Sequence, residues 1–225
     1  IDLVVLFPNG RISDVQRKQM TTTQSKNIHC LAVEGTFDDC QTIVKSLLNN
    51  KKICDSYNLS AVNSINWGRV MAQVIYYFYA ALKLGAPKNK INFSVPTGNF
   101  GDIFAGYVAY KMGLPIDKLC IATNSNDALS RFLKKGDYLI EDVKATMSPS
   151  MDIQIASNLE RLLYDCSGGN SKFINEIMED LKVKKNFKID VKTLECIKKV
   201  FLASGVSESE TKKTIYDFWK SSKLL

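Results

Sequence analysis

The chain has 225 residues, of which 45% are hydrophobic and 24% charged, so it has the composition of a globular protein with one sizeable core or two small domains. Its net charge of +7 comes mainly from lysine, and no basic stretch has the interleaved aromatic side chains of a nucleic-acid-binding surface. No apolar run approaches the roughly 18 residues that a membrane span needs, and no signal peptide is visible, so we expect a cytoplasmic protein.

Six cysteines are scattered along the chain without any Cys-x-x-Cys spacing, and His29 is the single histidine. A zinc site, or a mechanism that needs a Ser-His or Cys-His pair, is therefore not expected. For His29, a strand histidine bonded to the backbone is a simpler interpretation than a catalytic base. We expect buried, reduced thiols at Cys30, Cys40, Cys54, Cys120, Cys166 and Cys196.

The first predicted element, Leu3 to Phe7, has the apolar run of a fully buried strand and is ended by Pro8. The sequence starts with Ile1 rather than methionine, just before this strand, and it stops at the apolar Leu225. A natural N-terminus seldom begins in a core strand. We therefore expect the middle of a longer protein, or the ordered part of one.

Helices and strands then alternate with short connections. A helix is predicted over 14–22 with Ser13 as its N-cap, followed by a strand over 27–33. The next helix, over 37–48, keeps a 3.6-residue period of apolar residues and ends at two lysines. This order of elements favours a parallel sheet covered by helices.

A long amphipathic helix is predicted over 67–84, directly after the sequence Asn-Ser-Ile-Asn. In one interpretation these polar residues only cap the helix, and Arg69 is a surface charge. In the other, Ser64, Asn66 and Arg69 converge on an anion near the positive end of the helix, because residues three apart share a helix face. The local pattern by itself favours capping.

Residues 91–113 contain the local pattern that is most informative about function. A buried strand is predicted over 91–95, a glycine turn over 98–102, and a helix over 103–112 that Gly113 ends. Strand, glycine turn and helix together aim free backbone N–H groups at an anion, which glycine lets come close. The turn is neither a Walker loop nor a dinucleotide fingerprint, and an ordinary tight turn is the alternative.

The remaining elements are less regular. A strand over 119–122 is followed by polar residues 123–127 at its carboxyl end, where parallel sheets place their ligands, and then by a short helix over 128–133. Residues 137–153 are predicted to be irregular. Amphipathic helical segments follow near 172–182, 191–202 and 208–222, and Ser207 and Glu210 have the spacing of a capping box.

Six blocks of sequence carry a family resemblance. They are SVPTGNFGDIFAGY at 94–107, FPNGRIS at 7–13, GTFDDCQ at 35–41, NSIN at 63–66, ATNSND at 122–127 and SPSMDI at 148–153. The first block closely resembles the phosphate-cradling loop of threonine synthases, which use pyridoxal phosphate, and the other five resemble blocks of that family in the family's own order. The resemblance extends from Leu3 to about Tyr164 and is weak after Cys166.

The resemblance implies an α/β fold, a parallel β-sheet flanked by helices, of the class called fold type II among pyridoxal-phosphate enzymes. It implies three parts: an α/β subdomain at 1–65 that is the remainder of a small domain, an α/β cofactor-binding domain with the phosphate loop at 66–157, and a mostly helical appendage at 158–225.

The implied reaction converts O-phosphohomoserine and water to threonine and phosphate, with pyridoxal phosphate as the cofactor. The resemblance assigns cofactor binding to the turn, whose residues are Gly98, Asn99, Phe100, Gly101 and Asp102. Asp102 is expected to brace the turn through N–H groups. Substrate binding is assigned to Ser64, Asn66 and Arg69, with Arg69 on the substrate phosphate.

The catalytic lysine stays unassigned. In the family pattern the Schiff-base lysine lies upstream of a segment like Leu3–Phe7. The partner of the pyridine nitrogen lies downstream of a segment like the one that ends at Leu225. No lysine of this sequence lies in a matching motif. This sequence alone is therefore expected to be inactive.

Two other functions remain open. One is a non-catalytic module that binds phosphate or pyridoxal phosphate, and the other is a different lyase or dehydratase of the same fold type. The protein is expected to be a monomer or homodimer that acts on a small molecule.

Overall fold

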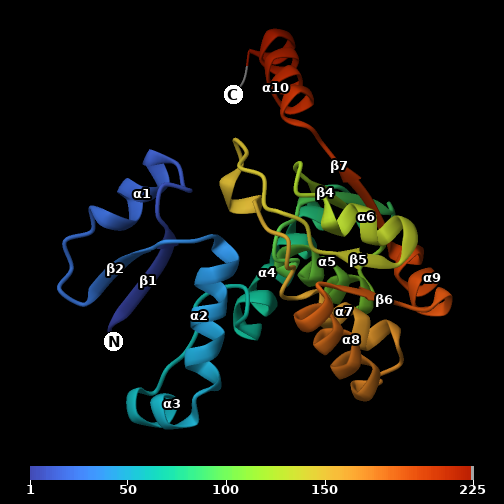
Figure 1. Cartoon of the computed structure of the whole chain (residues 1–225). Coiled ribbons are helices and arrows are strands. Elements are labelled where there is room, and N and C mark those ends of the chain that lie inside the picture. Colours follow the sequence, from blue (N-terminus) through green and yellow to red (C-terminus); the bar gives the residue numbers. More distant parts are fainter. Residues whose placement is uncertain (224–225) are drawn as a thin grey trace.

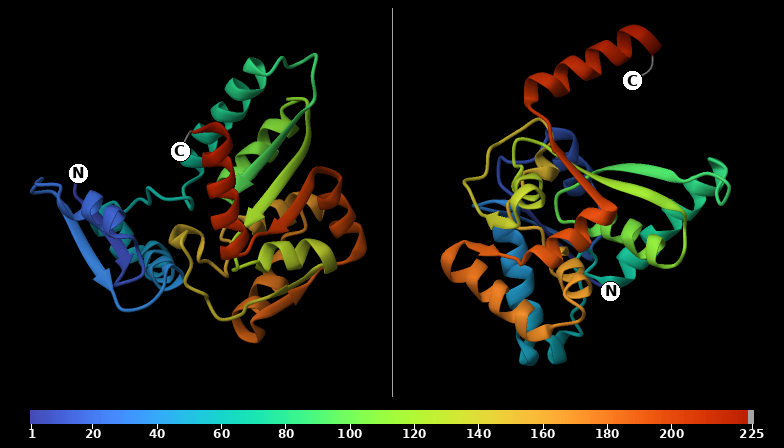
Figure 2. Two further views of the ribbon diagram at one scale, coloured as in Figure 1. Left: turned by 90° about the horizontal axis from the view of Figure 1, so that it is seen from above. Right: turned by 90° about the vertical axis from the view of Figure 1, so that its right-hand side faces the viewer.

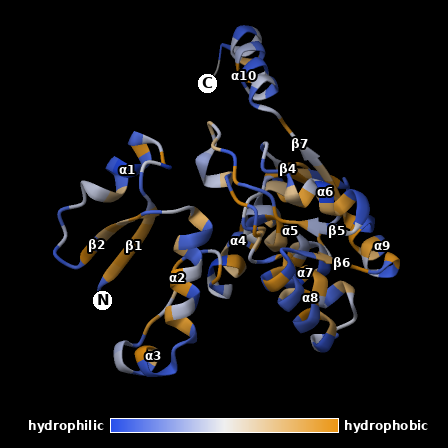
Figure 3. Ribbon diagram, viewed as in Figure 1, coloured by the Kyte–Doolittle hydropathy of each residue, from blue (hydrophilic) through white to orange (hydrophobic). Residues whose placement is uncertain are grey.

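In the computed structural model, which describes residues 1–223, the N-terminal elements form a unit beside a larger body (Figure 1). The unit is built on a two-stranded parallel sheet in which β1 (Leu3–Pro8) pairs with β2 (Ile28–Val33). The start of β1 is exposed, and only Phe7 and Pro8 at its end are buried. The prediction of a fully buried strand is therefore wrong: hydrophobic residues line both strands (Figure 3), but the described part of the chain leaves much of them uncovered.

The helices of this unit begin at well-formed caps. Helix α1 (Asp14–Thr21) has a capping box formed by Ser13 and Gln16, which confirms the predicted N-cap. Helix α2 (Phe37–Asn49) starts with a capping box of Thr36 and Asp39. Asn50 then ends α2 and caps a further helix, α3 (Lys51–Tyr57), by accepting a hydrogen bond from the amide of Ile53. Helix α3 was not predicted, because the lysines at 51 and 52 were interpreted as a helix end.

The larger body is organised around a three-stranded parallel sheet with the order β3 (Ile91–Pro96), β4 (Ile116–Thr123), β7 (Phe201–Gly205). Strand β3 leads through a turn into α5 (Gly101–Lys111), and α4 (Trp67–Lys83) packs along α5. The parallel sheet and its flanking helices confirm the predicted α/β class.

The C-terminal part is mostly helical, as expected, and it also contributes two short strands that pair with strands of the larger body. Helices α7 (Leu159–Cys166) and α8 (Ser171–Lys184) are followed by β6 (Asn186–Lys188), which pairs antiparallel with β5 (Asp137–Leu139). Helix α9 (Val191–Val200) packs beneath the sheet and leads directly into β7.

The predicted helix over 191–202 thus ends early. The backbone becomes extended at Phe201 (φ −101°, ψ 141°), and β7 adds to the edge of β4. The apolar period that suggested a longer helix continues into this strand, so local periodicity did not separate the two elements. The expected boundaries at 65/66 and 157/158 stay predictions, and residues 224 and 225 lie outside the described part of the chain.

The remaining elements frame the sheet. Helix α6 (Ala128–Lys135) follows β4, and a single 3₁₀ turn, η1 (Pro149–Met151), interrupts the long irregular segment. Helix α10 (Glu208–Ser222) extends away from the body, with side chains that are exposed or half-buried (Figure 2). Among residues 1–223, no helix has both the length and the apolar character needed to cross a bilayer.

Gly106 allows α4 and α5 to approach each other. A Cβ placed on it would lie 2.6 Å from Cε1 of Tyr77 on α4 and 3.0 Å from Cδ2 of Leu119 on β4. Both neighbours are buried, so neither can move aside without cost. The glycine is thus required by packing at the centre of the body.

We predict that Gly106→Ala lowers the free energy of unfolding by about 1–2 kcal/mol. In an unhindered helix the same substitution would raise it by about 0.5–1 kcal/mol, so the sign of the change reports the steric contact. Urea denaturation followed by circular dichroism measures it. An unchanged or higher midpoint would contradict the close packing of Tyr77 on α5.

Candidate anion-binding site

The turn between β3 and α5 presents a row of backbone donors. The amide of Thr97 makes the last bond of the sheet, to the carbonyl oxygen of Ala122 at 2.8 Å. In residues 1–223 no oxygen accepts a hydrogen bond from the next five amides, those of Gly98, Asn99, Phe100, Gly101 and Asp102. They lie at the N-terminus of α5, where the helix dipole adds partial positive charge. Free N–H groups at such a position are suited to an anion.

Phe100 gives the turn its shape. Its backbone is left-handed (φ 66°, ψ 3°), a conformation that costs a non-glycine residue roughly 1–2 kcal/mol. Its side chain is 1% exposed, and the ring centroid lies 5.7 Å from that of Phe201 on β7. Burial of the ring therefore offsets the backbone strain. A left-handed residue next to the right-handed start of a helix forms the concave arrangement of amides that binds anions.

Neighbouring segments of the protein leave little space for a side chain at either glycine of the turn. A Cβ on Gly98 would lie 2.9 Å from Cδ1 of Ile153, and a Cβ on Gly101 would lie 3.1 Å from Cβ of Ser64. Neighbouring protein segments thus fill the space where side chains would project. Close packing around the turn accounts for both glycines without any ligand.

Oxygen atoms of the turn are held by the surrounding protein. The carbonyl oxygen of Asn99 accepts hydrogen bonds from the amide and from Nδ2 of Asn158, at 3.1 and 3.0 Å. The side-chain Oδ1 of Asn99 accepts from Nε2 of Gln41 on α2 at 2.6 Å and from Ser157 Oγ at 3.4 Å. The bonds to the Asn99 carbonyl oxygen fix the peptide group between Asn99 and Phe100, whose N–H has no acceptor within residues 1–223.

Asn158 is itself fixed by a further contact. It is 1% exposed, and its Oδ1 accepts a hydrogen bond from Nε of Arg161 at 3.0 Å. Nη2 of Arg161 donates to the carbonyl oxygen of Ile65, just before α4. Asn158, Arg161 and Gln41 were not among the predicted site residues. Of the three, only Gln41 lies in a block that carried the family resemblance.

Asp102 interacts with a tyrosine and not with the amides that were expected to bind it. The Tyr77 hydroxyl donates to the backbone oxygen of Asp102 at 2.9 Å and to its Oδ1 at 3.3 Å. Partial burial raises the pKa of the Asp102 carboxyl, although the Tyr77 hydrogen bond and the charge of Arg69 act in the opposite direction. The carboxylate is thus held by α4.

The three predicted substrate residues lie in different surroundings. Asn66 is the N-cap of α4: its Oδ1 accepts from the amide of Gly68, and its Nδ2 donates to the carbonyl oxygen of Ala61. Ser64 lies against Gly101 at the turn. Arg69 is exposed, and its guanidinium donates to the carbonyl oxygen of Val62 at 3.3 Å. Ser64 and Arg69 are thus near the turn, whereas the polar atoms of Asn66 are used in capping.

Polar residues at the end of β4 hold the irregular segment in place. Asn124 and Asn126 donate to Oδ1 of buried Asp152 at 2.7 and 3.1 Å, and Thr146 bonds both carboxylate oxygens. The residues at this sheet edge, where a ligand was expected, therefore bind another part of the chain. They place Ile153 beside Gly98.

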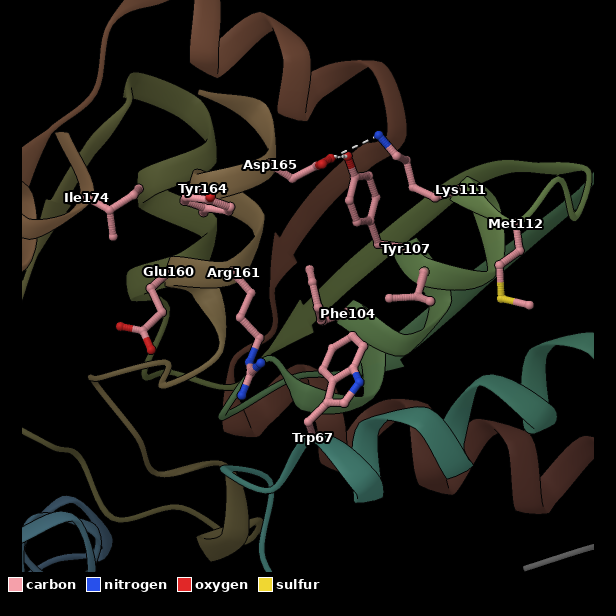
Figure 4. A pocket seen from close by; sticks show the side chains of 11 residues that line it. Trp67, Phe104, Tyr107, Lys111, Met112, Glu160, Arg161, Tyr164, Asp165 and Ile174 are labelled. Carbon is pink, nitrogen blue, oxygen red and sulfur yellow. Dashed lines mark hydrogen bonds and ion pairs between the residues drawn. The ribbon is translucent and has the colours of Figure 1, made fainter. Parts of the chain in front are cut away.

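Two cavities lie to the side of the turn, lined by residues outside 98–102. One cavity, of about 570 Å³, lies between α5, α7 and the start of α4 (Figure 4). In its wall the Arg161 guanidinium lies 5.3 Å from the centroid of the Trp67 ring. The Asp165 carboxylate accepts hydrogen bonds there from Lys111 and Tyr107. The other, of about 640 Å³, is lined by residues from 9–13, 36–37 and 143–152. Neither cavity encloses the free amides.

Comparison with known proteins identifies relatives of the whole chain. No protein-family model matches. The threonine synthases of Pseudomonas aeruginosa and Saccharomyces cerevisiae are 46% and 47% identical to it, in alignments that cover 99% of this chain and 47% and 46% of theirs. The human protein named threonine synthase-like 2 is 32% identical, over all of this chain and 48% of its own.

Solved structures agree with the sequence comparison. The structure of pyridoxal-phosphate-bound threonine synthase from Brucella melitensis superposes with a TM-score of 0.89 at 52% identity, covering 100% of this chain and 48% of that one. The yeast enzyme gives a TM-score of 0.84. The chain is thus homologous to threonine synthases and has their α/β fold, that of fold type II, and it spans about half the length of the curated relatives it matches.

We predict that Asn158→Ala lowers the free energy of unfolding by about 2–3 kcal/mol, because it removes a buried donor from the Asn99 oxygen and a buried acceptor from Arg161. The matched control is the neighbouring Ser157→Ala, whose bond to Asn99 is long, and its change should stay within about 0.5 kcal/mol. Urea denaturation measures both. Equal effects would contradict the central role of Asn158.

We also predict that Asp102→Asn stabilises the protein at neutral pH. The raised pKa of Asp102 means that its ionised form is disfavoured in the folded state. The destabilisation is absent at pH values below 3.8, the ordinary pKa of an aspartate carboxyl group. It grows as the pH rises through the pKa of Asp102 in the folded state, and it is constant at higher pH. The difference in urea midpoint between variant and wild type should therefore shrink as pH falls toward 4. A difference independent of pH would contradict the prediction.

Proposed function

We propose that this protein is a threonine synthase that converts O-phosphohomoserine and water to threonine and phosphate with pyridoxal phosphate. The observation that carries the proposal is the row of five unpaired amides from Gly98 to Asp102, in a chain 46–47% identical to threonine synthases. The identity to the protein named threonine synthase-like 2 is lower, at 32%, so the chain is more similar to the proteins named threonine synthase.

The residues of the turn fit the phosphate group of pyridoxal phosphate. Backbone N–H groups and the start of α5 offer donors and partial positive charge to a dianion, and the Asp102 carboxylate is bonded to Tyr77. When bound, pyridoxal phosphate supplies the electron sink that stabilises carbanions on the substrate. The turn binds the phosphate group and thereby orients the cofactor. Its rigidity comes from Asn158 and the buried Phe100 ring.

We propose that Arg69 binds the phosphate of the substrate, with Ser64 beside it. The Arg69 guanidinium is exposed and makes one long hydrogen bond, at 3.3 Å, so it can reorient toward a ligand. Asn66 acts by capping α4, which positions both neighbours. Phosphate leaves from the substrate's γ carbon and water adds at its β carbon. A cationic side chain that neutralises the phosphate assists the first step.

Several further expectations belong to this proposal. They are the division at 65/66 and 157/158, action in the cytoplasm, a monomeric or homodimeric state, and the inactivity of the chain as given. The runner-up function is a module that binds phosphate or pyridoxal phosphate without catalysis.

The natural gene product should have a visible absorbance band from pyridoxal phosphate that borohydride abolishes, and it should release phosphate from O-phosphohomoserine. Cofactor binding without phosphate release would favour the non-catalytic module. The absence of both would overturn the proposal.

In the active protein, Arg69→Ala should raise KM by about 10–100-fold while kcat changes less, and Arg69→Lys should restore part of the loss. The matched control is Arg17→Ala, since Arg17 is an exposed arginine that pairs with Asp14. If the KM of Arg69→Ala equals that of the wild type, Arg69 does not bind the substrate phosphate. That result would not contradict the proposed threonine synthase activity.

A further inference from the structure

Two cysteines far apart in the sequence meet in the larger body. Cys166 is the last residue of α7 and Cys196 lies in α9, 30 positions later, and their Sγ atoms are 2.7 Å apart. Both are half-buried free thiols. An S–S bond is about 2.0 Å long, so only a small movement separates this contact from a covalent bond.

The other cysteines have different partners. Cys30 donates to the carbonyl oxygen of Met20, and Cys54 donates to that of Leu48. In residues 1–223, no second pair of cysteine sulfurs lies within hydrogen-bonding distance. Among residues 1–223, Cys166 and Cys196 are thus the two thiols whose sulfurs already lie close enough together for oxidation to join them.

The surroundings of the two cysteines slow thiol–disulfide exchange and favour the disulfide that the exchange would form. Burial raises the pKa of the Cys166 thiol, so little thiolate forms at neutral pH and exchange is slow. Helices α7 and α9 contact each other, and Leu162, Leu163 and Ile197 on these helices are at most 1% exposed. A rigid contact of this kind keeps the two sulfurs together, which favours the closed disulfide over a mixed one.

We propose that Cys166 and Cys196 are a redox-sensitive pair that forms a reversible disulfide with a low-molecular-weight disulfide such as oxidised glutathione. One thiolate of the pair attacks a sulfur of glutathione disulfide, whose S–S bond breaks and releases one glutathione thiolate. The second thiolate then attacks the mixed disulfide, forms the protein S–S bond and releases the second glutathione. The two protein thiols lose two electrons and two protons, which end on two molecules of glutathione.

The bond would stiffen the support of the anion-binding turn. Helix α7 begins next to Asn158, which holds the Asn99 carbonyl oxygen, and α9 leads directly into β7, against which Phe100 packs. A disulfide between the two helices links these two supports covalently. By restricting the unfolded chain it should raise Tm by about 5–10 °C.

The test is to incubate the reduced, folded chain with glutathione disulfide, count free thiols and map disulfides by mass spectrometry after acid quenching. We expect the count to fall from six to four, a cross-linked peptide pair containing Cys166 and Cys196, and a higher Tm that dithiothreitol reverses. Six remaining thiols, or cross-links distributed over other cysteines, would overturn the proposal.

Two variants make the assignment specific. Cys196→Ser should abolish the intramolecular cross-link and the gain in Tm on oxidation. Cys120→Ser, which removes another half-buried thiol, should keep both. If the gain in Tm survives in Cys196→Ser, or if Cys166 there cross-links elsewhere with the wild-type yield, the pair is not the redox-sensitive element.

Discussion

The candidate site depends on the two hydrogen bonds that Asn158 donates to the carbonyl oxygen of Asn99. Two donors of one buried residue hold a peptide group that would otherwise be free to rotate at the end of a strand. The five amides from Gly98 to Asp102, three of which follow that oxygen, have no acceptor within residues 1–223. Unpaired amides are costly when buried and useful when they face an anion, so the arrangement is consistent with a structure built around a ligand.

Segments far apart in the sequence converge on this turn. Gln41 comes from the N-terminal unit, Ile153 from the irregular segment, and Asn158 from the start of α7. The irregular segment reaches its place because Asp152 is bonded to the asparagines after β4. The site is thus a product of tertiary structure, although its donors are all backbone groups of one short stretch.

The sequence predicted what local signals encode. The strand predicted at 91–95, the helix after the turn and the caps at Ser13 and Ser207 follow from apolar period, glycine and capping chemistry, and the structure confirms them. Asn158 could not be found in this way, because its bond to Asn99 spans 59 positions. Strand β7 was missed for a similar reason: its pairing with β4 is long-range, and its apolar residues continue the period of α9.

The hydrogen bond from Gln41 to the side chain of Asn99 joins α2 to a residue whose own amide is one of the free donors. Any ligand that shifts the Asn99 peptide must therefore change the energy of that bond, and hence the preferred position of the N-terminal unit. Thermodynamic reciprocity requires the converse: displacement of α2 must alter affinity at the turn by the same factor. The Gln41 bond would act together with the bonds of Asp38 and Gln16, which also connect the N-terminal unit to the larger body.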